Sequence, residues 1–256
     1  MTRAVAVNVA ANTNEPGFRG PVYPEGSFAY VPIPESAATL SRDRFPVDEP
    51  LPTYDDCDLP FSLPDSLRDR PVHMDPEFPG VHGRERATYG DPYAIKAAPI
   101  ADLEPGDWLL FYATLALRPV GWNGPGADGA DPDSTVVDGS VVDDDLAPDW
   151  GAYLFAGLRV QRILEGPDRE AAAEVVPTNA HLKRDPFDAR VVVAGDPDES
   201  GLFDRVVPLS TPATGADAND LVTELSSDSG KGPWWRRPMR FDEPATATVL
   251  DRIRWA

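Results

Sequence analysis

The residues best suited to chemistry are histidines, of which the chain has three. His73 stands in "VHMDPEF", two residues before Asp75, and a carboxylate at that spacing can orient an imidazole and raise its basicity. His181 stands in "PTNAHLKR", between Asn179 and Arg184, in a polar and charge-compensated cluster. We predict catalytic roles for His73, Asp75 and His181, with His181 the strongest candidate. The alternative for each histidine is a hydrogen-bonded residue of a surface loop.

The third histidine, His82, lies in "VHGRER" beside two arginines. A metal site made from His73, Asp75 and His82 has no further support in the sequence, so we predict no metal site. Cys57 is the single cysteine, which excludes a disulfide framework or a multi-cysteine zinc site within one chain. The sequence identifies no cofactor.

Several familiar catalytic motifs are missing. The chain has no G-x-x-x-x-G-K-[ST] loop, no G-x-G-x-x-G after a strand, no G-x-S-x-G and no H-E-x-x-H. Their absence argues against a P-loop NTPase, a dinucleotide-dependent oxidoreductase of the usual kind and a zinc protease.

The chain is strongly acidic, because 43 Asp and Glu residues oppose 23 Lys and Arg and give a net charge of −20. Arginine outnumbers lysine 20 to 3, and aspartate outnumbers glutamate 30 to 13. An Asp-rich, Lys-poor surface stays soluble in concentrated salt, where a Debye length of about 3 Å screens self-repulsion. We therefore expect a cytoplasmic protein of a halophile, with an ordinary acidic protein as the alternative. The apolar run "AVAVNVAA" is too short for a membrane span, and no signal-peptide pattern follows.

Stretches of apolar residues predict the strands that must position these candidates. Strands are expected over 3–12, Trp108–Leu117, Ala152–Leu164 and 189–196. Strands outnumber helices and do not alternate with them, which favours an α+β fold over a doubly wound sheet. We treat 1–256 as one domain with an acidic insertion at 127–149. The insertion contains eight Asp and no basic residue, so we expect it to be solvated. Short helices are predicted over 66–70, 167–176 and 217–227.

The segment Asn12–Glu35 combines many Gly, Pro and Asn residues with four aromatic residues, among them Tyr23. Its prolines exclude a helix and reduce the entropy lost on ordering, and Arg19 supplies a fork that fits phosphate. We interpret the segment as a preshaped binding loop and expect Arg19→Ala to weaken ligand binding without unfolding the chain. An ordered wrap over a sheet edge, or an edge strand at "SFAYVPIP", is the alternative.

The C-terminal segment Lys231–Ala256 departs from the acidic background, with six basic and three acidic residues. Trp234, Trp235 and Trp255 are interleaved with its arginines. Aromatic faces stack on bases and guanidinium groups bind phosphate, so the segment could contact nucleic acid. Tryptophans packed in the core, with arginines paired to the acidic surface, explain the pattern equally well.

Two resemblances to known families follow from these motifs. "PGDWLLFYATL" followed by "FAGLRVQRIL" resembles the strand pair of PUA-like barrels of the EVE and ASCH kind, over less than a quarter of the chain. The resemblance implies a PUA-like mixed β-barrel core with short helices and long Pro- and Asp-rich loops. Such barrels bind RNA or modified DNA bases by stacking a flipped base in an aromatic cleft.

A wider set of motifs resembles the third of the nucleotide-modification-associated domain families. "NVAANTNEPGFRGPVYPEGSFAYVPIPE", "HMDPEF", "TYGDP", "LEPGDWLLFYATL" and "NAHLKR" occur in this order. Ala10 stands where the family motif favours glycine, which weakens the case for a tight phosphate turn there. The motif positions that the resemblance carries over are Asn8, Asn12, Asn14, Arg19, Gly20, Glu25, Gly26, Ser27, His73 and Asp75.

These observations lead to a nucleotide-modification protein that binds a nucleotide or modified base of DNA or RNA in a loop-lined pocket. In an enzyme, Arg19 would bind phosphate, Asn12 would contact a base edge, and a histidine or carboxylate such as Glu25 would move a proton. A non-catalytic PUA-like reader of modified bases is the main alternative, and a protein that interacts through its acidic surface is the third. Catalysis requires Glu25, His73 and His181 to converge on one pocket. Further predicted nucleotide-binding residues are Tyr23, Tyr89, Tyr112, Asn179 and Arg184.

Overall fold

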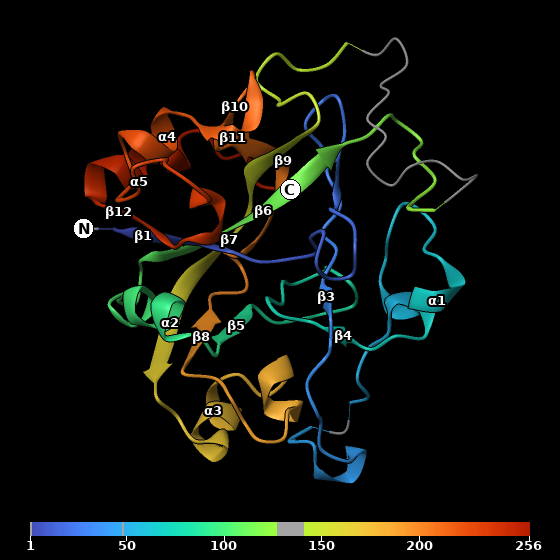
Figure 1. The fold of residues 1–256 in the computed structure, drawn as a ribbon. Coiled ribbons are helices and arrows are strands. Elements are labelled where there is room, and N and C mark those ends of the chain that lie inside the picture. Colours follow the sequence, from blue (N-terminus) through green and yellow to red (C-terminus); the bar gives the residue numbers. More distant parts are fainter. Residues whose placement is uncertain (1, 48, 127–140) are drawn as a thin grey trace.

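The computed structural model describes residues 2–47, 49–126 and 141–256, and its architecture is mixed α+β (Figure 1). The twelve strands of the described residues are β1 Ala4–Asn8, β2 Pro21–Val22, β3 Ile33–Pro34, β4 Val72–His73, β5 Thr88–Asp91, β6 Trp108–Leu117, β7 Trp150–Glu165, β8 Val191–Gly195, β9 Gly201–Pro208, β10 Ser210–Thr211, β11 Thr214–Ala218 and β12 Met239–Phe241.

These strands form one large sheet and two small ones within the described part of the chain. The large sheet has eight strands in the order β12-β1-β6-β7-β8-β5, with β2 paired to β6 and β9 paired to β7. Strand β1 runs parallel to β6, whereas β7 runs antiparallel to it. The small sheets pair β3 with β4 and β10 with β11.

Strand β6 lies in the middle of the large sheet because its sequence is apolar at nearly every position. Successive side chains of a strand point to opposite faces, so such a strand must be covered on both sides. Leu109, Phe111 and Leu115 enter one core, whereas Leu110 and Tyr112 enter the opposite one. All ten residues of β6 are buried as a result.

The described strands form a mostly open sheet without a closed barrel, so the PUA-like barrel expected from the motifs is not shown. The motif resemblance concerned a single strand pair, β6 and β7, which does form. Barrel closure would require the two edge strands, β5 and β12, to pair, and the pattern within one strand pair does not determine this. The predicted acidic insertion at 127–149 lies largely outside the described residues, which omit 127–140.

Helices and 3-10 turns of the described residues cover the faces and ends of the sheet. Those that bear on the argument are α1 Asp65–Arg68, α2 Ala94–Ala101, α3 Arg169–Val175, α4 Asp220–Thr223, α5 Glu243–Leu250, η4 Ala180–Lys183 and η5 Trp234–Arg236. In Figure 1, α4 and α5 lie near β12, at one edge of the large sheet, whereas α3 lies near β8. No helix in the described ranges is both long enough and apolar enough to cross a membrane.

The strands predicted over Trp108–Leu117, Ala152–Leu164 and 189–196 are confirmed, whereas the one predicted over 3–12 is shorter and ends at Asn8. Helices form in all three predicted places, but the one predicted over 217–227 is only the four-residue α4. Two longer helices, α2 and α5, were not predicted. Pro99 lies inside α2, and a proline in a helix removes a backbone donor, which hid the helix in the sequence. Helix α5 had a detectable start, because Asp242 caps it and Pro244 follows in its first turn.

The tryptophans of the C-terminal segment pack against the sheet. Trp234 is fully buried and donates its indole N–H to the Ala216 carbonyl at 2.9 Å. Trp255 stacks on Trp108 with ring centroids 5.1 Å apart and remains 42% exposed. Of the two interpretations of this segment, core packing therefore accounts for Trp234.

Candidate functional site

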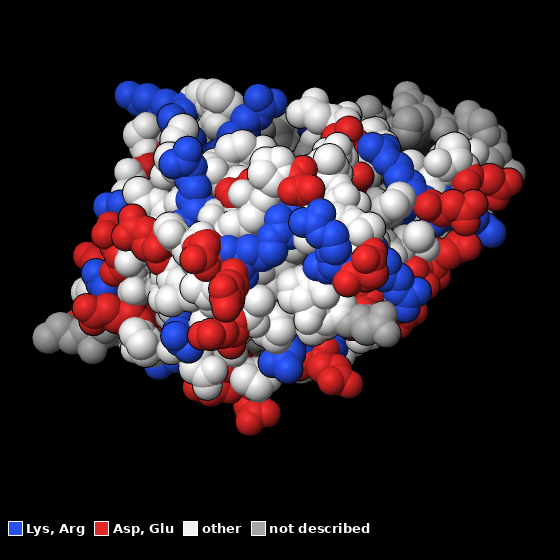
Figure 2. Space-filling view, turned by 90° about the horizontal axis from the view of Figure 1, so that it is seen from below, with Lys and Arg blue, Asp and Glu red and all other residues white. Residues whose placement is uncertain are grey.

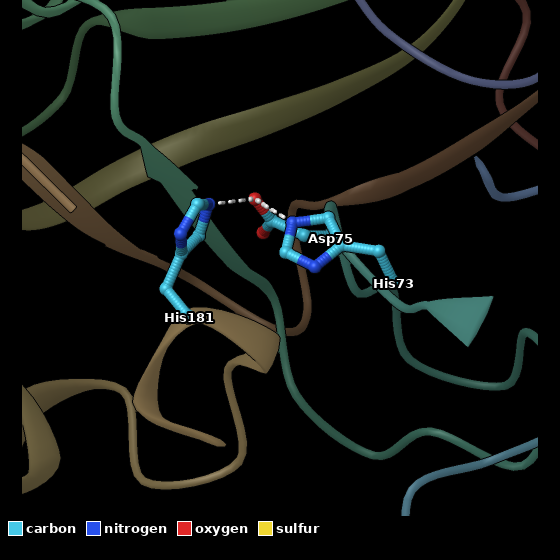
Figure 3. Close-up of side chains that lie close together, drawn as sticks. All are labelled: His73, Asp75 and His181. Atoms are coloured by element: carbon cyan, nitrogen blue, oxygen red, sulfur yellow. Dashed lines mark ion pairs between the residues drawn. The ribbon is translucent and has the colours of Figure 1, made fainter. Parts of the chain in front are cut away.

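Two histidines and one aspartate from distant parts of the chain meet in the interior (Figure 3). Nε2 of His181 lies 3.4 Å from an Asp75 carboxylate oxygen, and Nε2 of His73 lies 3.9 Å from the same oxygen. The two imidazole rings are nearly perpendicular, with centroids 4.7 Å apart. All three side chains are buried. We call His73, Asp75 and His181 the His–Asp–His centre.

Backbone elements hold each member of the centre in place. His73 ends β4, and Asp75 follows after one residue. The Asp75 carboxylate accepts the Gly90 backbone N–H of β5 at 3.1 Å and an N–H of the Asn179 side chain at 2.8 Å. Asn179 also caps η4, because its side-chain oxygen accepts the His181 backbone N–H. Asn179 thus fixes both the carboxylate and the turn that carries His181.

Gly90 allows β5 to approach the His181 ring. A Cβ atom at this position would lie 2.6 Å from Cδ2 of His181 and 3.1 Å from Oδ1 of Asn179. The ring carbon belongs to a side chain packed in the interior, so it has little freedom to move away. A glycine is therefore required for β5, η4 and the centre to come together.

An outer layer of charged groups orients the two histidines. Nδ1 of His73 is 2.7 Å from the Glu35 carboxylate, and Nδ1 of His181 is 2.5 Å from the Asp188 carboxylate. The Arg184 guanidinium lies between these carboxylates, 3.0 Å from Glu35 and 2.7 Å from Asp188. Because both Nδ1 atoms are engaged with carboxylates, both Nε2 atoms point inward to Asp75.

This arrangement changes the protonation of the groups involved. Burial alone raises the pKa of Glu35, but hydrogen bonds from His73 and Arg184 outweigh it and hold the pKa at about 2. Burial also opposes ionisation of Asp188, yet His181 and Arg184 lower its pKa to about 2. Both outer carboxylates are therefore charged at neutral pH.

The two imidazoles differ although they face the same carboxylate. Burial lowers the pKa of His73, and the hydrogen bond to Glu35 only partly offsets this effect. Burial also acts to lower the pKa of His181, but Asp188 and Asp75 outweigh it and raise the pKa to about 9. At neutral pH the proton therefore resides on His181, and His73 is neutral.

A second polar group lies beside the centre. The Tyr89 hydroxyl donates to Asp91 at 2.5 Å, and Lys96 of α2 donates to the Asn8 carbonyl at 2.8 Å. The Lys96 ammonium is also 3.6 Å from Asp91. Burial and the nearby charges of Asp91 and Asp75 raise the pKa of Tyr89 well above its ordinary value, so the hydroxyl keeps its proton.

The centre and this second group share the wall of one cavity of about 190 Å³. Tyr93 lines it and is 65% exposed, so this ring lies where the cavity meets solvent. Ala10, also in the wall, has a φ of 72° in the left-handed region, which favours glycine. The predicted site residues that line this cavity are Asn8, Asn12, His73, Asp75, Tyr89, His181 and Arg184.

Other predicted residues of the 12–35 segment lie elsewhere. The Arg19 guanidinium stacks over the Trp150 ring at 4.5 Å, and Gly20 packs against Leu115. Glu25 accepts the Ser27 hydroxyl at 2.5 Å. Glu25 and Gly26 line a separate cavity of about 390 Å³. The convergence of Glu25, His73 and His181 that we required for catalysis is therefore met only in part, because His73 and His181 share one cavity wall and Glu25 lies at another cavity.

Three further predicted residues also lie outside the wall of the first cavity. The Tyr112 hydroxyl donates to the Arg237 carbonyl at 2.6 Å in the core on the other face of the sheet. The backbone of Tyr23 pairs with Ser27 in a turn. Asn14 is exposed, and its backbone N–H donates to the side chain of Asn12.

His82 is also remote from the centre. Its Nδ1 accepts the Asp58 backbone N–H at 3.1 Å, its Nε2 is 2.9 Å from the Tyr30 carbonyl, and its ring stacks on Tyr30. A cluster of His73, Asp75 and His82 is therefore not formed. Among the described residues, the group with metal-ligand geometry is instead His73, Asp75 and His181.

Sequence reasoning missed several residues of the site. Glu35 directly follows β3, and the pairing of Ile33 with His73 in β3 and β4 brings it to that histidine. Asp188 lies four residues after Arg184, within the loop that leads to β8. Glu35 and Asp188 carried no local signal, whereas Tyr93 and Lys96 stand next to the "TYGDP" motif and could have been found from it.

Fold and site together define a mixed α+β protein whose buried His–Asp–His centre opens into a polar cavity. The chain belongs to the family described as nucleotide modification associated domain 3, whose model matches residues 3–251. No curated protein and no solved structure matches the chain. The family description supports a role in nucleotide modification.

Proposed function

We propose that this chain binds a nucleotide in the cavity of the His–Asp–His centre and modifies its base there. The observation that carries the proposal is the convergence of His73, Asp75 and His181 in the wall of one cavity. Titratable groups that converge in a buried cavity are the usual mark of an active site, because burying them uncompensated costs stability. The family description supports a nucleotide as the class of substrate.

The size and lining of the cavity support a single bound base or sugar. Its volume of about 190 Å³ is below the roughly 300–1,000 Å³ of pockets that enclose whole drug-sized ligands. The base would reach the centre with one face against the Tyr93 ring at the opening, and the sugar and phosphate would extend outward. The Lys96 ammonium has three N–H groups and contacts two acceptors, the Asn8 carbonyl and the Asp91 carboxylate. One N–H can therefore still donate to a phosphate oxygen.

On the face seen from below, the arrangement of charge also favours a nucleotide over a long duplex. Figure 2 shows the face seen from below, toward which α3 lies in Figure 1, with acidic and basic side chains interspersed. Proteins that follow a duplex backbone present a continuous basic stripe. Among the described residues on this face, the basic side chains do not form such a stripe.

A pair of neighbouring variants tests nucleotide binding. Tyr93→Ala removes the ring at the cavity opening, and Ile95→Ala removes an exposed side chain two residues on, in α2, that does not line the cavity. Loss of one base–aromatic stack costs about 1–3 kcal/mol, so we expect roughly 5- to 150-fold weaker binding for Tyr93→Ala. Ile95→Ala should bind like the wild type. Isothermal titration with the four common nucleoside monophosphates measures both variants, and equal affinities would contradict this placement.

Catalysis is tested by mass spectrometry of nucleosides from cells with and without the gene. A modified nucleoside that disappears with the gene, and also in an Asp75→Asn strain, supports an enzyme. Binding of modified nucleosides with an unchanged nucleoside profile would instead favour the non-catalytic reader. If the protein binds no nucleotide and the nucleoside profile does not change, the proposed function is refuted.

A further inference from the structure

We infer that the His–Asp–His centre binds one divalent transition-metal ion through Nε2 of His73, Nε2 of His181 and the Asp75 carboxylate. The inference concerns the same site as the proposed function and deepens it. Metal binding can nevertheless be measured without any nucleotide.

The spacing of the three ligand atoms fits a metal site. They all lie within 4.8 Å of one another, with Nε2 to carboxylate distances of 3.4 Å and 3.9 Å. Metal–ligand bonds of about 2.0–2.2 Å in a tetrahedral site place neighbouring ligand atoms roughly 3.4 Å apart. The pair formed by His181 and Asp75 already has this spacing. Nε2 of His73 lies about half an ångström farther from the shared oxygen than this spacing.

The outer carboxylates support the same inference. Histidines that bind metals commonly donate the other ring N–H to a carboxylate, which fixes the tautomer and the ring orientation. Glu35 stands at Nδ1 of His73, and Asp188 stands at Nδ1 of His181. In the neutral form of each imidazole, the carboxylate selects the tautomer that leaves a lone pair on Nε2, and His181 gives up its second proton when the ion binds. Both lone pairs are directed at the space beside Asp75 (Figure 3).

The charge of the buried cluster is also matched by a divalent ion. Glu35, Asp75 and Asp188 contribute −3 and Arg184 contributes +1, which leaves −1 with the proton on His181 and −2 once both imidazoles are neutral, as metal ligands must be. A buried net charge is costly unless it is compensated. A single divalent cation at the centre gives a total of zero.

The ligand set indicates the kind of ion. Mg²⁺ and Ca²⁺ prefer oxygen ligands, whereas imidazole suits transition metals. Two histidines and one carboxylate bind Zn²⁺ in catalytic sites and Fe²⁺ in facial triads, and both sites keep positions open for a substrate or water. Here the three ligands lie in the wall of the cavity, so open positions would face the proposed nucleotide.

Isothermal titration of protein without a polyhistidine tag, after chelator treatment, tests the inference. Zn²⁺ is titrated in air, Fe²⁺ under anaerobic conditions and Mg²⁺ as the reference ion. We expect one Zn²⁺ or Fe²⁺ per chain and much weaker binding of Mg²⁺. Asp75→Asn and His181→Gln should lower the affinity by at least about 100-fold, and Glu35→Gln by about 10- to 100-fold, as for other outer-layer residues.

Two controls separate this site from adventitious binding. His82→Gln removes the histidine outside the centre, and Cys57→Ser removes the single thiol; both should bind the metal like the wild type. Because a substitution in the centre could impair folding, circular dichroism accompanies every titration. X-ray absorption of the metal-loaded wild-type protein should detect two imidazole ligands without relying on any variant.

Three results would overturn the inference: no binding of Zn²⁺ or Fe²⁺, undiminished binding in folded Asp75→Asn, or an absorption spectrum without imidazole ligands. Titration of nucleoside monophosphates into metal-free protein separates the two proposals. Nucleotide binding without metal binding would refute the metal site and leave the proposed function standing. Metal binding without nucleotide binding would support the metal site and count against the proposed function.

Discussion

Two regions of this protein are equally buried but chemically opposite. Around Trp234, the side chains of Leu110, Phe203 and Phe241 form an apolar core against one face of the large sheet, which we call the Trp234 core. Trp234 is 0% exposed and His181 is 1% exposed, yet His181 is surrounded by charged groups. Burial alone therefore does not reveal a role. The Trp234 core stabilises the fold, whereas the His–Asp–His centre buries charge that must be compensated.

The largest expected effect is on the Trp234 core. Trp234→Ala leaves a cavity in a packed interior, and such substitutions cost about 3–5 kcal/mol of unfolding free energy. Urea denaturation measures the loss. Trp255→Ala, which removes a side chain that is 42% exposed, should cost less. Metal and nucleotide affinities of the folded Trp234→Ala protein should match the wild type, and a specific loss of binding would break the separation between the two regions.

Gly90→Ala should give an intermediate effect at the centre. The added Cβ would meet the His181 ring at 2.6 Å, and overpacking of this kind costs about 1–3 kcal/mol. Displacement of the ring should also weaken metal binding. The matched control is Gly201→Ala in β9, where nothing lies within 4 Å of the added Cβ. Thermal unfolding and metal titration of both variants make the test, and wild-type metal affinity in Gly90→Ala would argue against the role of the His181 ring.

The smallest effect is expected for Arg19→Ala. The guanidinium lies over Trp150, and a cation–π contact at such a site is worth about 0.5–1 kcal/mol of stability. Because Arg19 does not line the cavity, nucleotide affinity should change less than twofold. The comparison is with Lys96→Ala, which should weaken nucleotide binding. Weaker binding in Arg19→Ala would mean that the binding surface extends from the cavity to Trp150.

The strands were predictable because their physical signal is local. An uninterrupted apolar run such as Trp108–Leu117, rich in aromatic residues and preceded by a Pro-Gly-Asp turn, is typical of a strand buried on both faces. The closure of the sheet was not predictable, since it depends on which distant edges pair. The same contrast applies to the centre. The two-residue spacing of His73 and Asp75 is visible in the sequence, but their meeting with His181 is a product of tertiary structure.

The segment Asn12–Glu35 shows a similar limit on predicting the site from the sequence. Its composition indicated a shaped segment, and Asn12 does line the cavity. The residue that reaches the centre, however, is Glu35 at its end, and an isolated glutamate after a proline has no distinctive pattern. Arg19 had the right chemistry for phosphate, but its stacking on Trp150 depends on β7. Side-chain chemistry can thus be predicted more readily than the partner it meets.

The hydrogen bond from Asn179 to Asp75 joins residues 104 positions apart and has a consequence for dividing the chain. A cut between β6 and β7 would leave His73 and Asp75 on one fragment and Asn179 and His181 on the other. Neither fragment would then hold a complete set of metal ligands. Recovery of metal binding when the two fragments are mixed would report the reassembly of the fold, so the centre could serve as a complementation probe.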